Sequence, residues 1–340
     1  KRLNPLIAGE YVIIAPERFK RPSAIHHFSS ATSSDNCPFC PGKENETLPE
    51  ILSYRFPGSK KDDPSWWVRF IPNKFPAVNL SDNGYNSDGL LKKCVANGIH
   101  EVGITRFHEK DLGQPGFDNE WFLTRELLWA IHERKSVLHS QYPQLQFDSF
   151  FKNRGKAAGG SIDHPHIQLI ATELVPMRPQ LEYDTARQHA LRTGNCLLCD
   201  IIEEEMKSCE RVVEENKHYV VIEPFASRFP YETWIVPRFH QYSYSLTPET
   251  ASSLANIIRS TFTRLNSLLD NPAYNFYIKD ALLNGNVFFN SEIKNKFFHW
   301  YVELSPRLII EGGWERATSE IINPLTPEKA AEELRNISLS

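Results

Sequence analysis

Gly159-Gly160-Ser161-Ile162-Asp163-His164-Pro165-His166-Ile167-Gln168-Leu169 is the stretch of sequence that decides the fold. Alternate side chains of a strand lie on the same face of a sheet, so His164, His166 and Gln168 share one face. The two histidines are then about 7 Å apart, and one can bind a metal while the other does chemistry. The competing interpretation is a pair of ordinary surface histidines on a half-exposed strand. The rest of the chain decides between the two.

The composition is that of a globular protein with ample material for a core. The chain has 340 residues, of which 41% are hydrophobic and 24% charged, and its net charge is −4. A net charge this close to zero does not indicate a nucleic-acid-binding protein, which usually has an excess of basic residues. No apolar run is long enough to cross a bilayer, and no signal-peptide pattern is visible. We therefore expect a cytoplasmic protein that binds neither nucleic acid nor membrane.

Four of the six cysteines form two Cys-x-x-Cys pairs, Cys37/Cys40 and Cys196/Cys199. Without a secretory signal, such a pair indicates half of a metal site before it indicates a disulfide. A redox-active pair is the alternative, but the surroundings of a thioredoxin-like motif are missing at both places. Zinc is therefore the metal ion that each pair is expected to bind.

The order of motifs in the first half of the chain recurs in the second half. A helix is expected at 119–139 and another at 248–269, each with apolar residues at helical spacing. The His-to-His intervals also agree, because 164 − 108 = 56 and 299 − 240 = 59. The corresponding segments are 37–40 with 196–199, 70–75 with 221–225, 101–108 with 232–240, 147–152 with 274–279, and 164–168 with 299–303.

This repeat predicts two copies of one α+β unit, each an antiparallel sheet with a helix packed across one face. Pro176, Pro179 and Gly194 surround the stretch from Met177 to Thr193, where we place the boundary. The expected domains are 1–180 and 190–340.

Each half supplies two cysteines on a turn and two histidines on separate strands. Two thiolates and two neutral imidazoles make the closed, tetrahedral site that is typical of structural zinc. His100 and His218 are rivals for the third ligand of each half, but the repeat disfavours them because neither has a histidine counterpart. The predicted ligands are Cys37, Cys40, His108 and His164 in the first site, and Cys196, Cys199, His240 and His299 in the second.

The two copies differ at the residues that can do chemistry. Where the first half has His166 and Gln168, the second has Tyr301 and Glu303. We therefore expect catalysis in the first half, with His166 as a nucleophile that attacks phosphorus. Gln168 can then bond phosphoryl oxygens without adding negative charge. Ser161 and the glycine-rich turn at 155–160 offer further donors, although these glycines can also serve the turn alone.

These motifs resemble those of the galactose-1-phosphate uridylyltransferase family, which belongs to the histidine triad superfamily. In the wider superfamily the position of Gln168 is usually histidine, in hydrolases, whereas glutamine resembles the transferase branch. The resemblance covers essentially the whole chain and implies two tandem histidine-triad-like domains, the first catalytic. It rests on the segments Cys37-Pro-Phe-Cys-Pro-Gly-Lys-Glu44, Asn73-Lys-Phe-Pro-Ala77, Asn153-Arg-Gly155, Gly160-Ser161 and His164-Pro-His-x-Gln168.

The resemblance implies a double displacement. UDP-glucose gives its uridylyl group to His166 and releases glucose 1-phosphate, and galactose 1-phosphate or another hexose 1-phosphate then takes the nucleotide. A basic loop in the family reaches a neighbouring subunit, so a homodimer is expected. By position, Asn73, Phe75 and Pro76 line the nucleotide site, Asn153, Gly160, Ser161 and Gln168 contact phosphates, Arg18 and Arg21 belong to the basic loop, and Trp314 and Glu315 lie near the hexose.

Two departures keep other functions open. The second cysteine pair resembles plant-type relatives, one of which is an ADP-glucose phosphorylase that transfers an adenylyl group to inorganic phosphate. Ile167 replaces the small residue that both branches usually have there. The alternatives are therefore this phosphorylase, a dinucleoside-polyphosphate phosphorylase, a slow hydrolase, or a non-catalytic nucleotide-binding protein stabilised by zinc. For Trp314 and Glu315 the plain alternative is a packed aromatic and a solvated acid.

Overall fold

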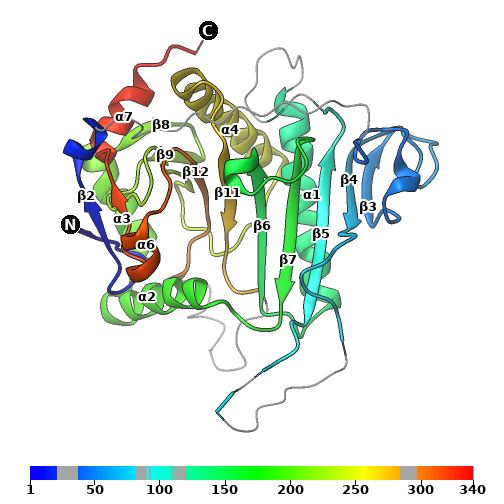
Figure 1. The fold of residues 1–340 in the computed structure, drawn as a ribbon, viewed down its shortest axis with the longest axis horizontal. Helices are drawn as coiled ribbons and strands as arrows, with labels where there is room; N and C mark the ends of the chain where they lie inside the picture. Colours follow the sequence, from blue (N-terminus) through cyan, green and yellow to red (C-terminus); the bar gives the residue numbers. More distant parts are fainter. Residues whose placement is uncertain are drawn as a thin grey trace.

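A computed structural model describes residues 1–20, 37–81, 90, 91, 93–108, 111, 120–283 and 297–339. Within them, ten strands form one antiparallel sheet in the order β3-β4-β5-β7-β6-β11-β12-β10-β9-β8 (Figure 1). The strands are β3 (Leu52–Arg55), β4 (Trp66–Pro72), β5 (Gly98–Thr105), β6 (Phe147–Arg154), β7 (His166–Thr172), β8 (Val212–Glu215), β9 (Tyr219–Ile222), β10 (Thr233–Pro237), β11 (Tyr274–Lys279) and β12 (Tyr301–Pro306).

The order of strands is symmetric about its centre, where β6 pairs with β11. Outward from this pair, β7 corresponds to β12, β5 to β10, β4 to β9 and β3 to β8. This correspondence follows the repeat in the sequence. Because hydrogen bonds continue across the centre, for example between Phe151 and Tyr277, the two copies share one sheet. The division into domains at 1–180 and 190–340 stays a prediction.

Two long helices cover one face of the sheet, α1 (Glu120–Gln141) and α4 (Pro248–Leu269). They lie side by side in Figure 1, one from each half. The start of α4 follows from its sequence, because the Thr247 hydroxyl accepts from the backbone N–H of Thr250 while the chain has Pro248 at the first helical position. Both predicted helices are confirmed to within two residues.

The main core fills the space between the sheet and these helices. Phe150 and Leu169 face each other across β6 and β7 and are buried in this core. Their chain neighbours Phe151 and Gln168 also face each other, and they point to the opposite face because the side chains of a strand alternate. The candidate catalytic residues of β7 therefore lie on the face away from α1 and α4.

The segment in which we place the boundary forms a helix, α2 (Met177–Thr193), which the sequence analysis did not predict. Pro179 lies in the first turn, where the backbone N–H has no partner within the helix, so the proline does not break it. Gly194 ends the helix with a φ of 82°, in the left-handed region. Tyr183 and Ala186 are buried against the second core, which contains Phe297 and Phe298.

A segment from each end region of the chain contributes to a small sheet at the side of the molecule. It orders as β1-β2-β13, in which β2 (Tyr11–Ile14) pairs with both β1 (Arg2–Leu3) and β13 (Ile322–Asn323). The helices α3 (Leu197–Ser208), α6 (Gly313–Thr318) and α7 (Pro327–Arg335) lie on the same side (Figure 1). Among the described helices, none has the length and apolar character needed to span a membrane.

Candidate active site

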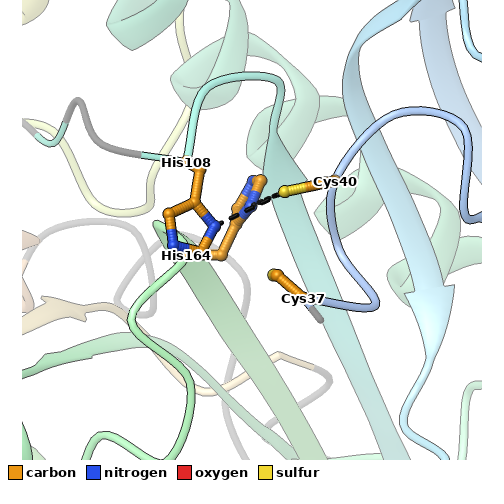
Figure 2. Close-up of side chains that lie close together, drawn as sticks. All are labelled: Cys37, Cys40, His108 and His164. Carbon is orange, nitrogen blue, oxygen red and sulfur yellow. Dashed lines mark hydrogen bonds between the residues drawn. The ribbon is translucent and has the colours of Figure 1, made fainter. Parts of the chain in front are cut away.

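The four predicted ligands of the first metal site converge from three parts of the chain (Figure 2). Cys37 and Cys40 lie on a turn, His108 follows β5, and His164 precedes β7. The donor atoms of all four lie within 4.8 Å of one another. The Sγ of Cys40 is 3.4 Å from Nδ1 of His108 and 3.6 Å from Nδ1 of His164. These residues form a cluster that could hold a metal ion.

The spacing of these atoms fits zinc. A tetrahedral zinc ion with Zn–S of about 2.3 Å and Zn–N of about 2.0 Å holds sulfur and nitrogen roughly 3.5 Å apart. The other ring nitrogen of His164, Nε2, lies 2.6 Å from the carbonyl oxygen of Thr105. A carbonyl can only accept, so Nε2 carries the proton and Nδ1 keeps its lone pair for the metal.

The second cluster has the same composition and spacing. Cys199 Sγ lies 3.4 Å from Nδ1 of His240 and 3.4 Å from Nδ1 of His299, with Cys196 beside them. One detail of the prediction is wrong, because the cysteine pair does not lie on a turn. Cys196 is the N-cap of α3, and Cys199 lies in the first turn of that helix. Both sequence-predicted ligand sets are brought together.

His166 is buried, with 7% of its surface exposed, so it is not the surface histidine of the competing interpretation. Its Nδ1 lies 2.7 Å from the backbone carbonyl of His164. Because the carbonyl must accept, Nδ1 carries the proton and Nε2 has the free lone pair. The ring also contacts Phe39, which lies between the two cluster cysteines, at 5.3 Å between centroids. The cluster thus supports the orientation of the candidate nucleophile.

Burial and, to a smaller extent, the positive charge of Lys152 lower the pKa of His166 to about 4, against the opposing effects of the His164 carbonyl and of Asp111. Lys152 is itself buried, donates to the backbone carbonyl of His166 at 3.4 Å, and pairs with Asp111 at 3.1 Å. Tyr274 donates to the same carboxylate at 2.9 Å. At neutral pH the imidazole of His166 is therefore uncharged, as a nucleophile must be.

The glycine-rich turn between β6 and β7 contains the 3₁₀ helix η4 (Lys156–Ala158). A Cβ at Gly160 would lie 3.0 Å from the Gly155 carbonyl oxygen and 3.1 Å from that of Asn153, so a larger residue would require the backbone of the turn to shift by a few tenths of an ångström. Asn275 of β11 donates from Nδ2 to the Asn153 side-chain oxygen at 2.8 Å. Ser161 is exposed at the end of this turn.

His100 is a residue whose place in the site the sequence analysis missed, having considered it only as a rival metal ligand. Its Nε2 lies 3.0 Å from Oε1 of Gln168 and 3.0 Å from Nδ2 of Asn73. The backbone N–H of Ala77 bonds its Nδ1 at 3.0 Å. The alternation of β5 could have revealed this, because it places His100 on the face of Val102, the residue opposite Gln168.

The other expected site residues differ in their surroundings. Asn73 accepts from the backbone N–H of Phe75 at 2.9 Å, which shapes the loop after β4, and the Phe75 ring is 82% exposed. Pro76 is also exposed, as is Arg18 in the 3₁₀ helix η1 (Pro16–Lys20). Arg21 lies outside the described residues.

The structure of one chain does not bring Trp314 and Glu315 to His166. Both belong to α6, which Figure 1 shows on the other side of the molecule from β7. Trp314 is 49% exposed, and Glu315 accepts from the backbone N–H of Gly312 at 2.9 Å. Their expected role near a hexose stays a prediction.

Known proteins are similar to this chain over most of its length. Residues 180–340 match the model of the galactose-1-phosphate uridyl transferase C-terminal domain family. An ADP-glucose phosphorylase of Arabidopsis thaliana is 30% identical over 98% of this chain and 92% of its own length. A galactose-1-phosphate uridylyltransferase of Thermotoga maritima is 29% identical over 98% of this chain and 97% of its own.

Solved structures extend the similarity to three dimensions. A crystal structure of an ADP-glucose phosphorylase from Arabidopsis thaliana with bound ADP-glucose is 29% identical, has a TM-score of 0.82, and covers 100% of this chain and 98% of that one. A galactose-1-phosphate-uridylyltransferase-like protein of the same plant has a TM-score of 0.79 at 29% identity, covering 100% and 99%. This chain belongs to the galactose-1-phosphate uridylyltransferase family of hexose-1-phosphate nucleotidyltransferases.

Proposed function

We propose that this enzyme transfers a nucleotidyl group from a nucleoside diphosphate glucose to a phosphate-bearing acceptor through a covalent intermediate on His166. The observation that carries the proposal is the state of this imidazole. Its Nδ1 proton is held by the carbonyl of His164, which leaves Nε2 with a free lone pair, and the side chain lies on the face of the sheet away from α1 and α4. A buried, neutral imidazole oriented in this way is a ready nucleophile.

In the first step, Nε2 of His166 attacks the α-phosphorus and forms a P–N bond. The P–O bond to the β-phosphate breaks, and glucose 1-phosphate leaves with the electron pair. In the second step, a phosphate oxygen of the acceptor attacks the same phosphorus and the P–N bond breaks. A phosphate monoester is a good leaving group near neutral pH, because its second pKa is about 6. No carboxylic acid beside His166 is needed to protonate it.

The phosphoryl group is negatively charged, and uncharged hydrogen-bond donors of this chain are proposed to bind its oxygens. Gln168 and Asn153 carry side-chain amides, and the turn that contains Gly160 and Ser161 carries backbone N–H groups. Donors fixed in place before the reaction stabilise the charge that develops on the phosphoryl oxygens. Asn73, Phe75 and Pro76 are proposed to line the nucleoside end of the site. The two Cys/His clusters are proposed to hold structural zinc.

The base of the donor nucleotide and the identity of the acceptor are the next point of the proposal. The sequence favoured UDP-glucose as donor and a hexose 1-phosphate as acceptor. ADP-glucose with inorganic phosphate is the second candidate, and a specific observation favours it. An ADP-glucose phosphorylase is similar to this chain over nearly its whole length and has a TM-score of 0.82 with its nucleotide sugar bound. We propose ADP-glucose as the first donor to test, with UDP-glucose in parallel.

The test is to incubate the protein without acceptor and with either nucleotide sugar labelled in its α-phosphate. Intact-protein mass spectrometry and label retention should show one nucleotidyl group per chain, and the faster donor identifies the base. Inorganic phosphate or galactose 1-phosphate, added afterwards, should release it. His166→Ala should take up no label. His139→Ala is the matched control, because His139 lies on α1 and its Nδ1 lies 2.9 Å from the carbonyl of Leu283. Absence of any adduct from both donors would refute the proposal.

A further inference from the structure

We propose that His100 and Asn275 are positioning residues that lock the amides of Gln168 and Asn153 with both NH₂ groups turned toward the phosphoryl group. The inference rests on the proposed function, because it concerns how the same site receives the transferred group. It assigns a task to one residue of β5 and to one of β11, a strand of the other half. Neither residue touches the reacting atoms, so each acts through the amide that it holds.

The orientation of Gln168 follows from a chain of two hydrogen bonds through His100. The backbone N–H of Ala77 can only donate, so Nδ1 of His100 is its acceptor and carries no proton. The proton of the neutral ring is then on Nε2. Oε1 of Gln168, at 3.0 Å, is the acceptor for this proton, whereas Nδ2 of Asn73 is a donor and does not compete for it. With its oxygen occupied, Gln168 has its NH₂ group free.

The orientation of Asn153 follows from Asn275. This side chain is buried, and its Nδ2 donates to Oδ1 of Asn153 at 2.8 Å and to the carbonyl of Ala158 at 2.9 Å. The carbonyl of Ala158 can only accept, so the atom of Asn275 that faces it must be the nitrogen. The same nitrogen therefore faces the oxygen of Asn153, which leaves the NH₂ group of Asn153 free.

Both amides thus meet a ligand as donors rather than as acceptors. Phosphoryl oxygens are acceptors with negative charge, and a reversed amide would present a carbonyl oxygen to them. An amide can rotate by half a turn at little steric cost, so the choice between the two orientations has to be made by neighbouring groups. His100 and Asn275 make that choice before substrate arrives, which is the condition for effective charge stabilisation.

The test for His100 uses an isostere and a rescue. His100→Phe keeps the ring shape without the donor and should lower kcat/KM for nucleotidyl transfer about tenfold, the size of one lost hydrogen bond in the transition state. His100→Gln places an N–H near the position of Nε2 and should restore most of the rate. In a Gln168→Ala background, His100→Phe should change the rate by less than about twofold, because there is no amide left to orient.

The test for Asn275 compares two substitutions of similar volume. Asn275→Leu removes the donor and leaves the Asn153 amide free to rotate. Asn275→Asp offers only acceptors, which favours the reversed amide and should slow transfer about tenfold more than Asn275→Leu. That difference should vanish when Asn153 is alanine. His218→Phe is the control for histidine loss, because His218 contacts Glu249 in the second half and should leave the rate unchanged.

Thermal unfolding of each variant first establishes that it is folded. Losses that remain in the Gln168→Ala and Asn153→Ala backgrounds would overturn the positioning roles while leaving the transfer reaction intact. The positioning role of His100 would also be overturned if His100→Gln failed to restore the rate and His100→Phe still lowered it in the Gln168→Ala background. A wild-type protein that forms no adduct and binds neither ADP nor UDP in calorimetry would instead refute the proposed function, and the positioning inference with it.

Discussion

At the scale of single residues, the site depends on groups whose protons are fixed by backbone atoms. The carbonyl of His164 holds the proton of His166 on Nδ1, and the N–H of Ala77 keeps Nδ1 of His100 unprotonated. In both rings a main-chain group that cannot change its role decides the tautomer. The chemistry of the free ring nitrogen is therefore set by the path of the chain.

Gly160 gives a prediction at this scale. In Gly160→Ala, the new methyl group meets two backbone carbonyl oxygens at 3.0 and 3.1 Å, which cannot move without shifting the turn that holds Asn153. We expect a loss of about tenfold or more in kcat/KM, because misplaced positioning groups are costly in rate. Transfer assays and thermal melts check this. Gly313→Ala, which meets no atom within 4 Å, is the control, and equal activity of both variants would contradict the argument.

At the scale of elements, α1 is tied to the sheet directly beside His100. Glu101 and Arg134 form a buried bidentate ion pair, with Nε–Oε2 of 2.7 Å and Nη2–Oε1 of 2.5 Å. Since neighbouring residues of a strand face opposite sides, Glu101 anchors β5 to the helix while His100 faces the site. The ion pair thus fixes the strand that carries His100.

Breaking this pair on one side should destabilise the protein strongly. Arg134→Met leaves the carboxylate of Glu101 buried without its charge partner, which should lower the free energy of unfolding by about 3 kcal/mol. Chemical denaturation measures the change. The double variant Glu101→Gln/Arg134→Met should recover much of the loss, because no uncompensated charge remains. If the double variant loses the sum of the single losses, the ion pair is not the cause.

The two Cys/His clusters should have different consequences for activity. Cys37→Ser and Cys196→Ser should each reduce the zinc content from two equivalents per chain to one, measured by elemental analysis, and lower the melting temperature. Only Cys37→Ser should also abolish transfer below that temperature, because Phe39, which lies between the cysteines of the first cluster, and the cluster residue His164 both contact His166. A wild type with clearly fewer than two equivalents would contradict the assignment of both clusters.

At the scale of the whole molecule, the second half repeats the order of strands without repeating the candidate catalytic residues. Tyr301, at the position that corresponds to His166, packs against Trp234 with 4.8 Å between ring centroids. Glu303, which corresponds to Gln168, pairs with Arg228 at 2.6 Å. Since β6 pairs with β11, this half still contributes Asn275 to the site. The second half therefore reaches the candidate site through the shared sheet.

Global stability should depend on pH through Glu223. This carboxyl is fully buried, and burial raises its pKa well above the ordinary value of 4.5, with Glu232 acting in the same direction and a hydrogen bond from Thr233 opposing. The folded state therefore keeps a proton that the unfolded chain loses above that value. The free energy of unfolding should fall as the pH rises from about 5 toward the folded-state pKa.

Glu223→Gln removes this titration, so the variant should gain stability relative to wild type between about pH 5 and pH 8 in denaturant titrations. Glu328→Gln is the control. Burial raises the pKa of Glu328, but hydrogen bonds from Arg2 and Arg211 lower it to about 2, so its contribution is already complete above pH 5. A constant difference between Glu223→Gln and wild type over this range would contradict the assignment.

The sequence by itself determined the repeat, both ligand sets and the candidate nucleophile, because each depends on residue type and order along the chain. Apolar residues at helical spacing also predicted α4 and α1, in which Leu127, Ile131 and Leu138 are buried. The helix α2 was missed because prolines in the sequence indicate a break, whereas in the first turn of a helix they are tolerated.

Only the tertiary structure decided what lies beside these residues. The pairing of β6 with β11 brings Asn275 to Asn153 from a position 122 residues away, and the loop after β4 brings Ala77 to His100. Such contacts depend on which strands become neighbours in the sheet and on the path of the loops, and strand order leaves no local pattern in the sequence. Residue types thus defined the chemistry, while long-range packing defined the orientation of the groups that carry it out.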